Sequence, residues 1–345
     1  MRVLFSTYPW AFETPGGGEV QLEKYAEHLP AHGIEVQRHD LWLANFADVA
    51  AVHFFSCVGG SVHFCNYVRQ RGLPLVISSS LWITPETTDH YPVDEIRAQL
   101  SLADVIVTNS DTESDMLSHV LTLPRDRFMA VMNGFEPRFL QPQDPDLFRA
   151  AFGIEGPFIL NVGNIEPRKN QLGLVRALAG YALPLVLLGH KRDSLYASQV
   201  LAEGGSRVRY IGALDHADPL LASAFGACSV FVLPSTLETP GLAALEAAAA
   251  GAPVAITSEG STREYFSSHA LYVDHRDPLD IRRGIEKALA QGRKPDLKAH
   301  VASRFRWPTV TERLLEVYAA ALQRQAARWL ARPARLIAPA GGSGY

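Results

Sequence analysis

The stretch that decides the fold is residues 230–246, which read VFVLPSTLETPGLAALE. Its first four residues are apolar and rich in valine, as in a buried strand, and its last residues open an alanine-rich segment of helical length. Pro240 is expected near the start of this helix, because proline is favoured in a first helical turn. A short strand followed by a helix is the repeating unit of a parallel sheet.

The same alternation of strand and helix runs through the whole chain in two consecutive series. It predicts an α/β protein with two doubly wound parallel sheets, and it argues against one wide sheet or a closed barrel. The strands are expected at residues 2–7, 34–39, 50–55, 75–78, 105–108 and 128–132 in the first series, and at 158–162, 185–188, 208–211, 230–233, 254–257 and 271–273 in the second.

Two domains are also expected from the chain length. The 345 residues exceed the roughly 250–300 residues at which a single hydrophobic core stops growing. Two prolines within QPQDPD, residues 141–146, predict the seam between the domains, and the Asp-x-Asp in this stretch is interpreted as turn chemistry and not as a metal site. We expect domains over residues 1–150 and 151–306, a C-terminal helix over 307–332 and a flexible tail over 333–345.

The composition excludes several classes of protein. A hydrophobic content of 47% and a charged content of 20% are typical of globular domains and argue against disordered, collagen-like and coiled-coil chains. Cys57, Cys65 and Cys228 lack C-x-x-C spacing, which argues against a disulfide framework or a zinc site. The sequence opens without a signal-peptide pattern and has no apolar run of ~18 residues, so we expect a cytoplasmic protein.

The charge distribution argues against a nucleic-acid partner. Residues 1–150 carry 10 Lys or Arg against 19 Asp or Glu, whereas nucleic-acid binding depends on cations that neutralise phosphates. The basic residues gather near the C-terminus, where Arg324, Arg328 and Arg332 recur at four-residue spacing. This stripe could contact anionic lipid, but we favour packing against the acidic first domain.

Two segments could bind an anion. The glycine-rich turn at residues 15–18 ends the first strand region, and the backbone amides of Gly17 and Gly18 could approach an anion at the start of the next helix. The turn lacks the third glycine of G-x-G-x-x-G, which disfavours a nicotinamide oxidoreductase. In the second series, Arg168 and Lys169 lie at the entry to a helix, where cations are unfavourable unless an anion binds between them. A tight turn without a ligand and a solvated cation pair remain alternatives.

Two carboxylates flank the helix start at Pro240. Glu238 lies just outside the helix, and Glu246 follows about two turns later among alanines and leucines that are expected to be buried. A buried acid needs a hydrogen-bonding partner, which the vicinal diol of a sugar could supply. The alternative is a helix-capping role for Glu238 and a buried ion pair for Glu246.

Together these stretches resemble the glycosyltransferase family 4 group, of GT-B fold. The resemblance is carried by the acidic pair with Gly-Leu between its members in residues 238–246, by the EPRKN turn at 166–170 and by the PGGG loop at 15–18. It implies two Rossmann-like domains that face each other across a cleft, with a C-terminal helix that crosses back to the first domain.

The resemblance also implies an activity. Members of this kind catalyse retaining transfer of a sugar from a nucleotide-diphosphate sugar, bound mainly by the second domain, to an acceptor held by the first, without a metal or other cofactor. The acceptor could be a small molecule, a lipid-linked compound or a glycan. By resemblance, the catalytic residues are Glu238, Lys169 and Arg168, and the substrate-binding residues are Gly17, Gly18, Asn164, Ser80, His53, Pro240, Gly241, Leu242 and Glu246.

Two positions depart from the family pattern. Ser80 stands where a histidine is common, and Asn164 stands where many members have an arginine. His53 is a candidate substitute for the first, although a lone histidine at a strand end is also typical of a structural residue. These departures keep open a GT-B nucleotide-sugar epimerase and a catalytically silent nucleotide-sugar-binding partner.

Overall fold

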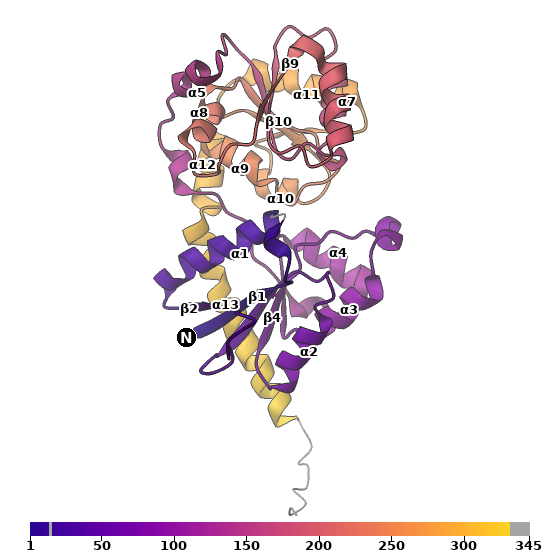
Figure 1. The fold of residues 1–345 in the computed structure, drawn as a ribbon, viewed down its shortest axis with the longest axis vertical. Helices are drawn as coiled ribbons and strands as arrows, with labels where there is room; N and C mark the ends of the chain where they lie inside the picture. Colours follow the sequence, from indigo (N-terminus) through magenta and orange to yellow (C-terminus); the bar gives the residue numbers. More distant parts are fainter. Residues whose placement is uncertain (14–15, 332–345) are drawn as a thin grey trace, which may run out of the picture.

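A computed structural model describes residues 1–13 and 16–331, arranged as two sheets of six parallel strands, one above the other in Figure 1. The predicted tail at 333–345 and Arg332 lie outside the described residues. The first sheet has the order β2-β1-β3-β4-β5-β6 and the second β12-β11-β10-β7-β8-β9. Two doubly wound sheets are therefore confirmed.

The first sheet forms where the sequence places short apolar runs, and its central strands are buried along their whole length. Its pairings are parallel throughout, with Phe5 opposite His53, for example. The strands are β1 (Arg2–Thr7), β2 (Glu35–Arg38), β3 (Ala51–Phe55), β4 (Leu75–Ser78), β5 (Val105–Thr108) and β6 (Phe128–Ala130), and the helices are α1 (Gly17–His28), α2 (Val62–Gln70), α3 (Val93–Leu102) and α4 (Asp111–Leu121).

The second sheet has the same construction, with helices between successive strands. Its strands are β7 (Ile159–Val162), β8 (Leu185–Leu188), β9 (Val208–Gly212), β10 (Val230–Leu233), β11 (Val254–Thr257) and β12 (Leu271–Val273). Its helices are α5 (Pro145–Phe152), α6 (Gln171–Ala177), α7 (Ser194–Gly204), α8 (Pro219–Ala227), α9 (Leu242–Ala249), α10 (Thr262–Phe266), α11 (Pro278–Gln291) and α12 (Pro295–Arg304).

Each sheet has one point at which the strand order reverses, between β1 and β3 in the first and between β7 and β10 in the second. Ligands of doubly wound sheets bind outside the carboxyl ends of the strands at such points. The glycine-rich turn follows β1, the Arg168-Lys169 pair follows β7, and Glu238 follows β10. The topology thus brings the three sequence motifs to the two switch points.

The seam between the domains differs from the predicted one. The stretch that was expected to be a linker begins α5, with Asp144 as the N-cap that accepts a hydrogen bond from the Asp146 amide and with Pro145 in the first turn. Phe148, near the middle of α5, is fully buried in the core of the second domain. Pro145 starts a helix and does not end a domain, so residues 144–152 group with the second domain and not with the first.

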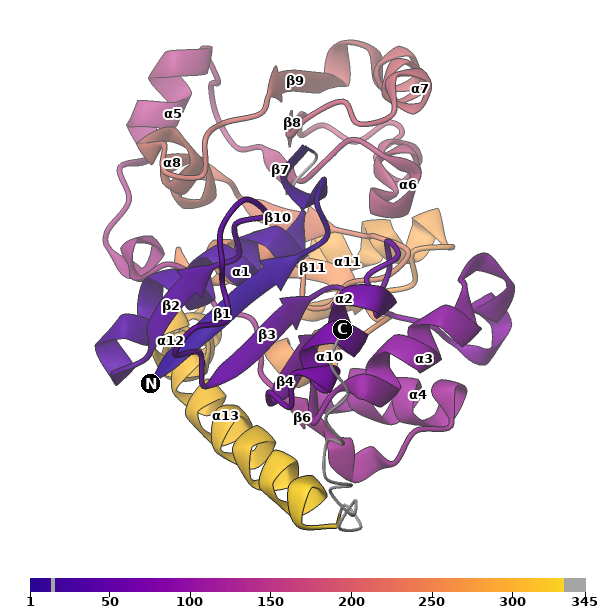
Figure 2. The same cartoon turned by 60° about the horizontal axis from the view of Figure 1, so that its bottom comes forward.

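The last helix, α13 (Trp307–Leu330), runs from the second domain along the first (Figures 1 and 2). Trp307, Leu314 and Tyr318 are buried in the same cluster as residues of β1, β3 and β5. Farther along the helix, an Arg328 nitrogen lies 2.5 Å from a carboxylate oxygen of Asp104 in the first domain. Two of the three arginines of the predicted stripe therefore contact protein, because Arg324 also donates to the Asp104 carbonyl at 3.0 Å.

Among the described residues, no helix has the length and apolar character needed to cross a membrane.

The Asp104 contacts yield a prediction about stability. The Asp104 side chain is 4% exposed and faces both Arg69 and Arg328, and removal of one partner of a buried ion pair is strongly destabilising. Asp104→Asn should lower the free energy of unfolding by about 3 kcal/mol, as measured by urea denaturation. Asp126→Asn is the matched control, since that exposed carboxylate is 3.8 Å from Arg324 and should change stability by less than about 1 kcal/mol. Equal effects would contradict the prediction.

Candidate active site

The centre of the site is an ion pair between the two switch-point loops of the second sheet. Lys169 ends a short 3-10 helix after β7, and its Nζ lies 2.5 Å from Oε1 of Glu238, which follows β10. Ser235 Oγ donates to the same carboxylate oxygen at 2.6 Å, and an Arg168 nitrogen is 3.8 Å from it. The structure therefore brings together the three residues for which the sequence analysis expects catalytic roles.

Glu238 is an anion despite its burial. The residue is only 4% exposed, and burial alone would raise the pKa of its carboxyl group. The positive charges of Lys169 and Arg168, with hydrogen bonds from Lys169 and Ser235, outweigh this effect and hold the pKa of Glu238 below its usual value. Glu166 also belongs to this cluster, because its carboxylate lies 3.2 Å from an Arg168 nitrogen. The site thus contains two cations and two carboxylates in a partly desolvated setting.

Close packing fixes the backbone around Glu238. Gly260 has a φ of +89°, and a Cβ there would lie 2.2 Å from the carbonyl oxygen of Glu238. Gly241 has a φ of +82°, and a Cβ there would lie 2.8 Å from a methyl carbon of Leu233 and 3.3 Å from Oε2 of Glu238. Both positions require glycine, because other residues would be strained and would displace the carboxylate.

The helix after this turn carries Glu246. Leu242 is the first residue of α9 and packs against the core cluster of the first domain, and Pro240 is buried beside it. Glu246, one turn farther on, is 6% exposed, and its Oε1 lies 2.6 Å from Nε2 of His216. The partner that this buried acid requires is therefore present within the protein, as a histidine in the loop between β9 and α8.

In the first domain, the glycine-rich turn lies beside Ser80. Gly17 begins α1, and a Cβ on Gly18 would be 3.7 Å from Ser80 Oγ. Ser80 Oγ in turn donates to Oε1 of Gln21 at 3.4 Å. The side-chain amide of Gln21, which is 1% exposed, donates to Asn109 at 2.7 Å. Gly17, Gly18 and Ser80 thus lie together, at the edge of the first sheet.

The substrate-binding role predicted for His53 is wrong. The residue lies in β3 with no exposed surface, and its two ring nitrogens are hydrogen-bonded to Tyr318 Oη and Ser78 Oγ, both at 2.9 Å. Burial lowers the pKa of His53 to about 3, so the ring is neutral. His53 is a core residue that joins β3 to β4 and α13, and it has no nitrogen left for a substrate.

Asn164 lies at the rim of the second sheet, where its carbonyl accepts a hydrogen bond from the Gln171 amide at 2.9 Å. The sequence analysis missed a further cation on the same rim, in addition to Arg168 and Lys169. Arg192, in the loop after β8, is 3.8 Å from Glu166, and its charge acts on Tyr8 of the first domain, where it opposes the rise in the pKa of the phenol caused chiefly by burial. The charge of Arg192 therefore acts on a side chain of the first domain.

The domains meet at α10. Tyr265 Oη donates to the Asn109 carbonyl at 2.6 Å and accepts from the Asn133 amide at 2.8 Å. The neighbouring Glu264 accepts from the amides of Asp111 and Thr112 at 3.0 and 2.7 Å. An acidic side chain of the second domain thus occupies the N-terminus of α4, a position that the helix dipole favours.

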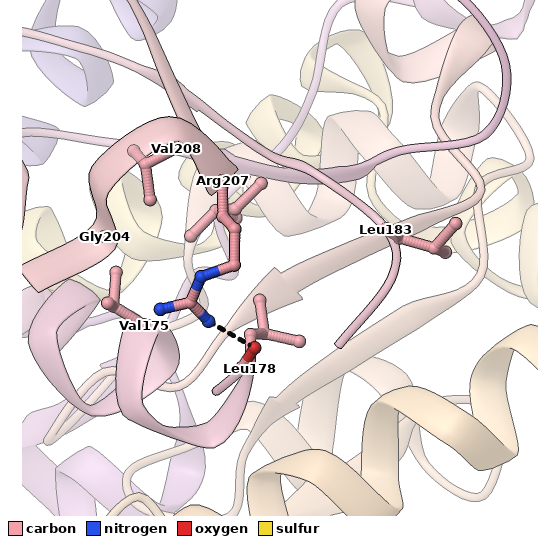
Figure 3. Close-up of a pocket in the computed structure, with 7 residues that line it drawn as sticks. Val175, Leu178, Leu183, Gly204, Arg207 and Val208 are labelled. Carbon is pink, nitrogen blue, oxygen red and sulfur yellow. Dashed lines mark hydrogen bonds between the residues drawn. The ribbon is translucent and has the colours of Figure 1, made fainter. Parts of the chain in front are cut away.

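Two other features fit a ligand poorly. A small cavity of about 10 Å³ lies behind the second sheet, where the Arg207 side chain donates to the Leu178 carbonyl (Figure 3), and this volume holds about one water at most.

Within residues 1–13 and 16–331, Glu27, His28 and Glu136 have the spacing of a metal site. Lys24 Nζ lies 2.7 Å from each of the two acids and already neutralises them.

With this geometry established, the chain can be compared with known proteins. Residues 144–302 match the family described as glycosyl transferases group 1. This part of the chain belongs to the group 1 glycosyl transferases. The resemblance seen in the sequence is confirmed for the domain that contains Lys169, Glu238 and Glu246.

The chain is also similar to curated proteins, two of which are the following. D-Inositol 3-phosphate glycosyltransferase of Acidothermus cellulolyticus is 30% identical over 65% of this chain and 54% of its own length. O-antigen chain mannosyltransferase B of Escherichia coli is 27% identical over 72% of this chain and 70% of its own. The chain thus spans about half the length of the first of these relatives.

Solved structures extend the likeness to both domains. Sucrose-phosphate synthase from Thermosynechococcus elongatus superimposes with a TM-score of 0.77 at 18% identity, over 94% of this chain and 99% of that one. Alr3699/HepE of Anabaena, in complex with UDP and glucose, gives a TM-score of 0.75 at 17% identity over 92% and 99%. At such identities the likeness concerns the fold, and the predicted GT-B architecture is confirmed.

The His216–Glu246 contact predicts a measurable titration. The hydrogen bond to Glu246 raises the pKa of His216, against the opposing effects of burial and of the charges of Arg138 and Lys24. In an NMR titration, His216 should titrate above the usual histidine pKa of about 6.5. The hydrogen bond of protonated His216 to Glu246 then stabilises the folded protein fully below about pH 6.5. This stabilisation is lost as the pH rises through the pKa that His216 has in the folded protein.

Glu246→Gln should return the pKa of His216 to about 6.5 or below, because the carboxylate charge is gone. Glu286→Gln, an exposed substitution on α11, serves as the control and should leave this pKa unchanged. An unshifted pKa in Glu246→Gln would show that the carboxylate does not set the titration.

Proposed function

We propose that this protein is a metal-independent, retaining glycosyltransferase that uses a nucleotide-diphosphate sugar as donor. The observation that carries the proposal is the cluster of Lys169, Arg168 and Glu238 at the switch point of the second sheet, with Glu246 along the adjoining helix. Two curated relatives are named as a glycosyltransferase and a mannosyltransferase, and a structure of the same fold is in complex with UDP-glucose. These findings support the proposal.

Each residue has a chemical role in the proposed reaction. Lys169 and Arg168, with the amides of Gly17, Gly241 and Leu242, would surround the diphosphate and stabilise the charge that develops on it as it leaves. Glu246 would accept hydrogen bonds from the ribose hydroxyls. Glu238 would accept hydrogen bonds from the donor sugar.

In this mechanism the bond between the anomeric carbon and the diphosphate oxygen breaks, and a bond to the acceptor oxygen forms on the same face. The acceptor proton passes to the departing diphosphate. The cations supply the positive charge that a divalent metal ion supplies elsewhere.

A thermal-shift screen against nucleoside diphosphates and their sugars is the direct test, because a ligand that binds only the folded state raises its melting temperature. One nucleotide and one of its sugars should raise the melting temperature selectively, and EDTA should change neither this shift nor the transfer of sugar. A shift with the nucleotide but no transfer to any acceptor would favour a binding-only protein. A strict requirement for magnesium would contradict the metal-independent mechanism.

Lys169→Ala should weaken binding of the nucleoside diphosphate. Loss of a charge-assisted hydrogen bond costs about 1.5–3 kcal/mol, which corresponds to roughly a tenfold to hundredfold rise in the dissociation constant. Titration calorimetry measures the effect, and Lys287→Ala, at an exposed position of α11, is the matched control. Equal dissociation constants for the wild-type chain and Lys169→Ala would remove Lys169 from the diphosphate site.

Glu238→Ala should separate binding from catalysis. Lys169 loses its carboxylate partner in this variant, so its charge remains available to the diphosphate and nucleotide binding should survive. Transfer should fall at least a hundredfold, the scale of losing a group that contacts the reacting sugar. Glu259→Ala is the control, as this half-exposed acid follows β11 and pairs with Arg276. Normal turnover by Glu238→Ala would exclude Glu238 from the reaction.

A further inference from the structure

The two carboxylate oxygens of Glu246 have different surroundings. Oε1 lies 2.6 Å from Nε2 of His216. Within the part of the chain that the structure describes, Oε2 accepts no hydrogen bond, and it is not one of the enclosed polar atoms that lack a partner. The protein therefore occupies one oxygen of this carboxylate and leaves the other accessible.

Glu246 lies on the side of α9 that faces the first domain. Leu242, at the start of this helix, packs against the core cluster that contains residues of β1, β3 and β5, and residues four positions apart lie on the same side of a helix. Just before Leu242, a Cβ on Gly241 would be 3.3 Å from Oε2 of Glu238. The helix thus leads from the ion pair of the proposed diphosphate site to Glu246 along the boundary with the first domain.

His216 is held firmly enough to orient this carboxylate. Its ring makes an edge contact with the buried ring of Phe139, with 5.8 Å between the centroids. The loop around it is closed by Asp215, whose side chain accepts from the Ala217 amide at 2.7 Å, and by Asp218, the N-cap of α8. The His216 side chain still keeps 44% of its surface exposed, so the ring borders solvent and not only protein.

Nε2 of His216 is the donor in the bond to Glu246. An ionised carboxylate can only accept, so the ring carries a proton on Nε2 whether it is neutral or charged. Hydrogen bonds to a carboxylate are short and directional, and this one restricts rotation of the Glu246 side chain. A binding group whose orientation is fixed beforehand loses less freedom when its ligand binds.

The accessible oxygen matches the chemistry of a ribose. A carboxylate oxygen has two lone pairs, and a vicinal diol can donate one hydrogen bond to each. We propose that His216 is a positioning residue, which holds Glu246 so that Oε2 receives the 2′ and 3′ hydroxyls of a ribonucleoside diphosphate. This inference rests on the proposed function, since it concerns the nucleotide part of the donor. A site built to bind a hydroxyl rejects a ligand that lacks it, so His216 sets the preference for ribonucleotides over 2′-deoxyribonucleotides.

The test compares two ligands on the full chain by titration calorimetry. They are the nucleoside diphosphate selected by the thermal-shift screen, such as UDP, GDP or ADP, and its 2′-deoxy counterpart. The wild-type chain should bind the ribonucleotide at least tenfold more tightly. Equal binding of the two compounds would overturn the inference.

Two variants separate positioning from a structural role. His216→Phe keeps an aromatic ring beside Phe139 but has no donor, and it should reduce the preference to less than about threefold, mainly by weakening the ribonucleotide. Continued binding of the 2′-deoxy compound shows that the site is folded. His216→Gln restores an N–H donor near the position of Nε2 and should return the preference to within about twofold of the wild-type value.

A purely structural role predicts a different result. Both nucleotides would then weaken equally in His216→Phe, and an unchanged preference would overturn the inference, as would a His216→Gln variant that behaves like His216→Phe. His269→Phe is the control, because this exposed histidine lies between α10 and β12, and it should change neither dissociation constant.

The failure of this inference can be told from the failure of the proposed function. If the wild-type chain binds no nucleotide, the proposed function is overturned, and the role of His216 with it. If it binds a nucleotide and Lys169→Ala weakens that binding, but His216→Phe keeps the full preference for the ribonucleotide, only the role of His216 is overturned.

Discussion

The backbone of Phe135 is hydrogen-bonded to both ends of the segment 305–307, with N–O distances of 2.8 Å to Phe305 and 3.2 Å from Trp307. These bonds join the two places at which the chain crosses between the domains. Gly134 makes the approach possible, since a Cβ there would lie 2.8 Å from the Trp307 nitrogen. Because the two crossings share one point, the carboxyl edges of both sheets are held opposite each other, and the site between them depends on this constraint.

The charges at the donor side follow from the same arrangement. A buried carboxylate such as Glu238 is costly unless it is paired and hydrogen-bonded, and the loops after β7 and β10 meet its requirement with Lys169 and Ser235. Arg168 remains half exposed near the pair. Glu166 pairs with Arg168 and lies near Arg192, so the three cations Lys169, Arg168 and Arg192 face two carboxylates. This leaves net positive charge at the switch point, where an anionic donor would bind.

The strands were predicted well because a buried strand appears in the sequence as a short run of apolar residues. Seven of the twelve strands begin and end at the predicted residues, among them β1, β4 and β5. The domain seam was misplaced because Pro145 can either interrupt a helix or start one, and only the contact of Phe148 with the second core decides between them.

Residues of the candidate site could be predicted only where they lie in recognisable sequence motifs. Glu238, Lys169 and Glu246 lie in recognisable motifs, and the structure brings the first two together. The role expected for His53 failed because its partners, Ser78 and Tyr318, are 25 and 265 residues away. His216 was missed for a similar reason: it is a lone histidine in a loop, and only the fold places it 2.6 Å from Glu246.

The structure explains why a serine stands at position 80, where the glycosyltransferase family commonly has a histidine. Ser80 has a φ of +43°, a conformation that is uncommon outside glycine, and strain of this kind persists only where neighbouring contacts impose it. Glu113 holds the backbone of Ser80 in this conformation, because its carboxylate accepts hydrogen bonds from both neighbours of Ser80, the Ser79 hydroxyl and the Leu81 amide. Ser80 in turn contacts Gln21, whose amide reaches Asn109 and Asn133.

Asn109 and Asn133 are the residues that Tyr265 contacts from the second domain. A continuous series of hydrogen bonds therefore runs from Ser80 on the first sheet, through Gln21 and the two asparagines, to α10 of the second. The loop that contains Ser80 and the contact between the domains are parts of one polar network. A residue at position 80 is thus constrained by domain packing as well as by any ligand, and the serine fits a network that is complete without an imidazole.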